Sequence, residues 1–114
     1  MRKIVIFSLL CLFFTSVVAS AHPPQDILLK FDSVTNTLSV LILHEVKNPK
    51  EHFIKKIEVK LNGSSIIVQK ISRQDTENTQ TVAYIISDAN PGDVIALEAE
   101  CNISGKMEKS LKAE

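Results

Sequence analysis

The stretch FIKKIEVKLNGSSIIVQKI, residues 53–71, decides the fold. From Ile57 onward apolar residues alternate with charged ones, and a period of two is typical of a half-buried β-strand. The pair Asn62-Gly63 follows, which is the strongest short signal for a two-residue hairpin turn. An apolar segment returns after the turn, so this stretch predicts an antiparallel hairpin.

Similar short segments recur on both sides of this hairpin. The sequence predicts strands at residues 26–32, 38–44, 53–61, 65–71, 81–87 and 94–101, a polar connection at 73–80, and a last strand or a frayed end at 106–114. No segment has the periodicity of a helix. About seven short strands separated by turn residues predict an all-β fold, an immunoglobulin-like antiparallel β-sandwich. Another small β-barrel is the alternative.

Residues 1–21 have the pattern of a cleaved secretory signal peptide. Arg2 and Lys3 form a basic start, an apolar run follows, and Ala19-Ser20-Ala21 is the small-x-small pattern that signal peptidase cuts. The apolar run is too short to cross a bilayer comfortably. We therefore expect an exported protein, periplasmic or extracellular, that is not embedded in the membrane.

Cleavage after Ala21 would leave residues 22–114 as one domain, and cleavage after Ala19 is the alternative. Loss of Arg2 and Lys3 reduces the 13 basic residues to 11 against 13 acidic ones, a net charge of about −2. Nucleic acid is therefore not an expected partner, since it is bound by basic surfaces.

Cys101 and three histidines are the candidate functional residues. Cys101 continues an apolar row of alternating residues, so a packed core thiol is one interpretation. His44 falls at a strand end, His22 lies near the predicted cleavage point, and His52 closes a polar loop, where a lone histidine is usually solvated. Taken together, thiolate and imidazole suit iron, copper or zinc rather than calcium or magnesium. No catalytic triad or compact metal motif stands out, and no catalytic residue is assigned.

Two stretches carry a resemblance to a known family. HEVKNPKEHFIKKIEV (residues 44–59), followed by Asn-Gly, and AECNISGKMEKS (residues 99–110) together resemble the iron-binding domain of desulfoferrodoxins and superoxide reductases. The resemblance implies an immunoglobulin-like sandwich with one iron, held by four histidines in a plane and one axial cysteine. It also implies one-electron reduction of superoxide to peroxide, with an external electron donor.

Carried over by position, Cys101 matches the axial thiolate and Asn102 matches the residue that follows it. His52, which precedes an aromatic residue and an isoleucine, matches the second middle histidine, and His44 matches the first. His22 lies at about the spacing of the early histidine. The resemblance therefore implies a metal site made of His22, His44, His52 and Cys101.

The chain departs from the family pattern at three positions. Ser104 stands where the family has its last histidine, Ala21 where it has a lysine near superoxide, and Glu45 where it has a proline. A site of three histidines and one cysteine suits iron by resemblance, and zinc or copper by affinity order. A sandwich that has lost the iron site and now binds a partner or carries structure is the alternative from another class.

Overall fold

The computed structural model describes residues 22–114, and the predicted signal peptide lies outside them. All seven strands are present, including the last one, and this part of the chain has no helix. The strands are β1 (Asp26–Asp32), β2 (Thr37–Leu43), β3 (Ile54–Leu61), β4 (Ser64–Lys70), β5 (Thr79–Ile85), β6 (Val94–Cys101) and β7 (Lys106–Lys112). No helix within residues 22–114 is long and apolar enough to cross a membrane.

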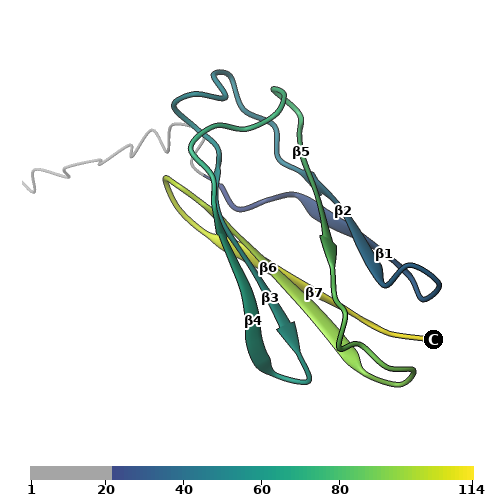
Figure 1. Ribbon diagram of the computed structural model, residues 1–114. Helices are drawn as coiled ribbons and strands as arrows, with labels where there is room; N and C mark the ends of the chain where they lie inside the picture. Colours follow the sequence, from purple (N-terminus) through teal and green to yellow (C-terminus); the bar gives the residue numbers. More distant parts are fainter. Residues whose placement is uncertain (1–21) are drawn as a thin grey trace, which may run out of the picture.

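Two antiparallel sheets face each other (Figure 1). One sheet has the order β1-β2-β5 and the other has the order β4-β3-β6-β7. Three connections, β2–β3, β4–β5 and β5–β6, pass from one sheet to the other. This arrangement confirms the predicted β-sandwich and has the sheet-crossing connections of immunoglobulin-like domains.

The β3–β4 hairpin forms as predicted, with Leu61 paired to Ser64 across a two-residue turn. Asn62 and Gly63 both have positive φ, 48° and 86°. A type I′ turn requires this conformation at both central residues, and its twist matches that of the flanking strands. Asn36 also has a positive φ, 54°, in the turn between β1 and β2.

The core lies between the two sheets. It is built from the inward-facing residues, which alternate with outward-facing ones along a strand. In β6, Ile95, Leu97 and Ala99 are fully buried, while the residues between them are partly exposed. This is the alternation that the sequence predicts. β2 and β3 contribute further fully buried apolar side chains: Leu38, Ile42, Ile54, Ile57 and Val59.

The two open sides of the sandwich are closed by different contacts. On one side the Tyr84 hydroxyl of β5 donates a hydrogen bond to Gln69 Oε1 of β4, at 2.5 Å. On the other side β1 contacts β7, and Lys109 Nζ lies 3.4 Å from an Asp26 carboxylate oxygen. Burial raises the pKa of Tyr84 from its ordinary 10.0 to about 12.

The titration of Tyr84 tests this packing directly, because it is the one tyrosine of the chain. Its ultraviolet absorbance should show a tyrosinate transition near pH 12. The unfolded chain loses this proton near pH 10, so the free energy of unfolding should fall as pH rises above 10. Tyr84→Phe should remove that part of the pH dependence. Tyrosinate appearing near pH 10 in the folded protein would contradict the burial.

A candidate metal centre at one end of the sandwich

His44 enters the site because it continues the inward row of β2. Val40 and Ile42 face the core, and His44, two residues after Ile42, is fully buried. Its backbone N–H donates to the Asn78 carbonyl at 2.9 Å, which extends the pairing of β2 with the segment before β5. Counting by two along the strand predicts this placement.

Gln74 is the buried partner of His44 and was missed by the sequence analysis. It is fully buried, although it falls in the segment predicted as a polar connection. Its Oε1 lies 2.7 Å from His44 Nδ1, and its Nε2 donates to the carbonyls of His44 at 2.7 Å and Thr76 at 3.0 Å. Its backbone N–H donates to the Pro49 carbonyl. A glutamine among polar loop residues carries no sequence signal for such a role.

His52 lies at the end of a tight turn and is only 6% exposed, so the solvated interpretation was wrong. The Asn48 carbonyl accepts hydrogen bonds from the backbone N–H groups of Glu51 and His52. Asn102 then holds this segment in place. Its Oδ1 accepts from Phe53 N at 2.8 Å, and its Nδ2 donates to the Glu51 carbonyl at 2.9 Å.

Cys101 ends β6 with its thiol directed at His52. The side chain is buried and unpaired, and Sγ lies 3.1 Å from His52 Nε2. The Ile103 backbone N–H also points at Sγ, at 3.5 Å. The Cys101 N–H donates to the Gly105 carbonyl and closes the β6–β7 turn. The burial fits the core-thiol interpretation, and the thiol also makes a hydrogen bond to an imidazole.

His22 is brought to the site by the short segment that precedes β1. Pro24 is fully buried, and Gln25 N–H donates to the Leu43 carbonyl at 2.8 Å. Gly105 packs on Pro23 so closely that a Cβ at this position would lie 2.9 Å from two atoms of the Pro23 ring. The β6–β7 turn therefore fixes where the His22 side chain can lie.

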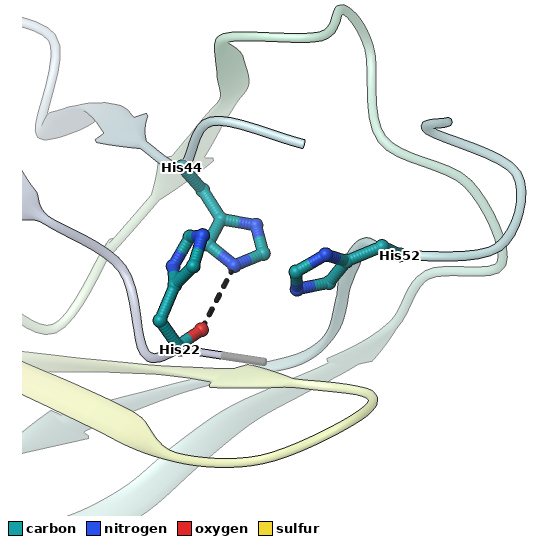
Figure 2. A group of neighbouring side chains, drawn as sticks. All are labelled: His22, His44 and His52. Atoms are coloured by element: carbon teal, nitrogen blue, oxygen red, sulfur yellow. Dashed lines mark hydrogen bonds between the residues drawn. The ribbon is translucent and has the colours of Figure 1, made fainter. Parts of the chain in front are cut away.

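The three imidazoles converge at this end (Figure 2). Ring centroids are 5.0 Å apart for His22 and His44, 5.3 Å for His22 and His52, and 4.8 Å for His44 and His52. One nitrogen from each ring can be chosen so that all three lie within 4.8 Å of one another. Three imidazoles at this separation can bind one metal ion. Cys101 lies outside this cluster of three but touches its His52 member.

A backbone carbonyl oxygen places the proton of the His22 ring. His22 Nδ1 lies 2.9 Å from the Pro23 carbonyl, an acceptor only, so Nδ1 carries a proton and Nε2 is left for a metal ion.

The environment of His52 favours its neutral form. Burial lowers the pKa of His52, and the neighbouring His44 and His22 rings lower it further. A low pKa keeps His52 in the neutral form that metals bind.

The three departures from the family pattern lie differently in space. Ser104 is exposed and is not part of the histidine cluster, and Ala21 lies outside the described residues. Glu45 and Lys47 are both exposed and line a hollow of about 390 Å³ beside His22. Of the three histidines, His22 is the one that lines this hollow.

No protein-family model, curated protein or solved structure matches this chain. The resemblance to the superoxide reductase iron domain therefore stays a prediction made from the residues quoted above. The three histidines named by that resemblance lie together, as a metal site requires.

Gly105→Ala tests how His22 is held, with Gly92→Ala as the matched control. Both glycines have positive φ, 84° and 93°, so each substitution costs about 1–2 kcal/mol in backbone strain. Only the Cβ at position 105 meets another residue. We expect Gly105→Ala to displace Pro23 and to weaken zinc binding about tenfold in a chelator competition, which Gly92→Ala leaves unchanged. Equal zinc affinity in the two variants would contradict this placement.

Proposed function

We propose that this protein is an exported mononuclear iron protein that reduces superoxide to peroxide. The metal would be held by His22, His44, His52 and Cys101. The observation that carries the proposal is the convergence of the three histidines at one end of the sandwich, with Cys101 in contact with His52. Because these residues are far apart in the sequence, it is the fold that brings them together.

The distance between Cys101 Sγ and His52 Nε2 supports a shared metal. With metal–sulfur and metal–nitrogen bonds of about 2.3 and about 2.1 Å, two ligands lie about 3.1 Å apart at right angles and about 3.6 Å apart at a tetrahedral angle. The distance in the protein is 3.1 Å. This is also the distance of a hydrogen bond between a thiol and an imidazole, and it leaves Cys101 and His52 close enough to hold one metal ion together.

The donor set restricts the metal to a small group. One thiolate with imidazoles suits iron, copper or zinc, and the resemblance selects iron among them. Bound iron would supply the one-electron redox chemistry, with the thiolate donating electron density to it. The chain's own contribution is to hold the neutral imidazoles and the thiol in place and to keep bulk water from the buried side.

The hollow beside His22 is the route that we propose for a small anion. Lys47 and Glu45 line it with opposite charges, so the attraction of an anion depends on Lys47 and is opposed by Glu45. Superoxide takes up one electron and two protons to give hydrogen peroxide. The electron would come from an external donor protein, and the protons from water that reaches the hollow.

Lys47→Glu tests whether superoxide reaches the metal site past Lys47. We expect the second-order rate constant with superoxide, measured by pulse radiolysis on iron-loaded protein, to fall by about tenfold at low salt, with a smaller difference at high salt. Lys30→Glu is the control. It changes the net charge of the protein equally, but on the outer face of the β1-β2-β5 sheet. Equal rate constants for the two variants would mean that anions do not enter past Lys47.

Metal content in the wild type and in Cys101→Ser tests the site itself. Protein purified without oxygen should hold about one iron per chain, and oxidation should produce a visible thiolate-to-iron charge-transfer band. Cys101→Ser should lose both. Stoichiometric iron retained in that variant would remove Cys101 from the site. No metal in the wild type, with the thiol unreactive until unfolding, would favour a partner-binding module.

A second candidate function is a zinc or copper site without turnover. It is favoured by the exposure of Ser104, which leaves the cluster without the fourth histidine of the family. Four ligands close a structural zinc site, whereas a catalytic site keeps an open position. Zinc or copper in place of iron, with no change in the metal-bound spectrum on addition of superoxide, would select this function.

A further inference from the structure

We propose that Gln74 is a positioning residue for the metal centre, and that it holds His44 in the tautomer whose Nε2 binds the metal. This inference rests on the metal-binding part of the proposed function and is independent of superoxide chemistry. Gln74 is fully buried, and within residues 22–114 its side chain hydrogen-bonds to His44 and to the Thr76 carbonyl but to no other ring of the cluster, so its influence passes through His44.

The orientation of the Gln74 amide is determined by its neighbours. Its NH₂ end lies 2.7 Å from the His44 carbonyl and 3.0 Å from the Thr76 carbonyl. Both carbonyls accept hydrogen bonds and cannot donate them. An amide turned the other way would place its oxygen against these two oxygens, with no proton between them. The oxygen end of Gln74 must therefore face His44 Nδ1, at 2.7 Å.

This orientation fixes the proton of His44. Gln74 Oε1 has no proton to give, so Nδ1 carries a hydrogen and Nε2 is the nitrogen left for a metal ion. Histidines that bind metals commonly donate their other N–H to a partner of this kind, which sets the ring orientation and the ligand nitrogen. Gln74 occupies that place for His44.

The other nitrogen of His44 also faces an acceptor. Nε2 lies 3.2 Å from the His22 carbonyl oxygen (Figure 2), so in the metal-free protein a proton on Nε2 is donated to this oxygen. A metal ion bound at Nε2 would take the place of that proton, whereas Gln74 holds the proton on Nδ1. Gln74 thereby leaves Nε2 as the nitrogen of His44 that can become a metal ligand.

Gln74 also ties the position of His44 to two loops. Its backbone N–H donates to the Pro49 carbonyl in the β2–β3 loop, which leads to His52, and its side chain bonds to Thr76 in the β4–β5 loop. A neutral amide does this without placing an extra charge beside the ligands. A carboxylate here would face two carbonyl oxygens with no donor to offer them.

Gln74→Leu tests the proposal, with Gln80→Leu as the matched control. Gln80 is also a buried glutamine, but its side chain bonds to Asp75 N and the Thr81 carbonyl and to no histidine. Zinc alone is the probe, in competition with a chromophoric chelator. We expect Gln74→Leu to weaken zinc binding by about tenfold to a hundredfold and Gln80→Leu to leave it within about threefold.

Long-range proton–nitrogen NMR of the histidine rings gives the readout that a merely structural role would not move. In the zinc-loaded wild type, His44 should show a protonated Nδ1 and a metal-bound Nε2. In Gln74→Leu the Nδ1 proton should lose its protection from exchange with water. This spectrum of the wild type decides the proposal even if Gln74→Leu does not fold.

The outcomes separate this inference from the proposed function. Zinc bound with equal affinity by Gln74→Leu and Gln80→Leu, or by Nδ1 of His44 in the wild type, would overturn the role of Gln74 and leave the metal site standing. A wild type that binds neither zinc nor iron would overturn the proposed function and this inference with it.

Discussion

Burial of two imidazoles and a thiol at the end of an apolar core is the constraint on which the rest of this structure depends. A buried polar group without a hydrogen bond costs free energy of about 1–3 kcal/mol, and each of these groups is satisfied. His44 is held by Gln74 and by the His22 carbonyl, and His52 by Cys101. Because these partners come from separate loops, the loops at this end must close together for the domain to fold.

The strand pattern was predictable because it depends on local alternation. The segments at 26–32 and 94–101 form strands with the predicted bounds, and the Asn-Gly turn forms the predicted hairpin. Counting by two along β2 puts His44 on the face of Val40 and Ile42, but the sequence left this face open because Leu41 and Leu43 are apolar too. The burial of His52 did not follow, since it depends on Asn102, a residue fifty positions later, closing over the turn that presents it.

The sequence predicted the residues of the candidate site but not the contacts that hold them in place. The histidines and Cys101 were singled out by their chemistry and by a family resemblance, and the histidines do lie together. Gln74 was not found, because a glutamine becomes a histidine partner only through contacts across thirty positions of sequence. The Gly105–Pro23 contact was missed for the same reason, since a glycine in a turn gives no indication of what packs against it.

The central claim is that the thiol and the imidazoles share one metal ion. X-ray absorption at the edge of the bound metal, on the metal-loaded wild type, tests it most directly. The account predicts one sulfur neighbour at about 2.3 Å together with imidazole nitrogens at about 2.0–2.1 Å, with the multiple scattering that histidine rings produce. A first shell of nitrogen and oxygen without sulfur would contradict it, and would return Cys101 to the core as an ordinary buried thiol.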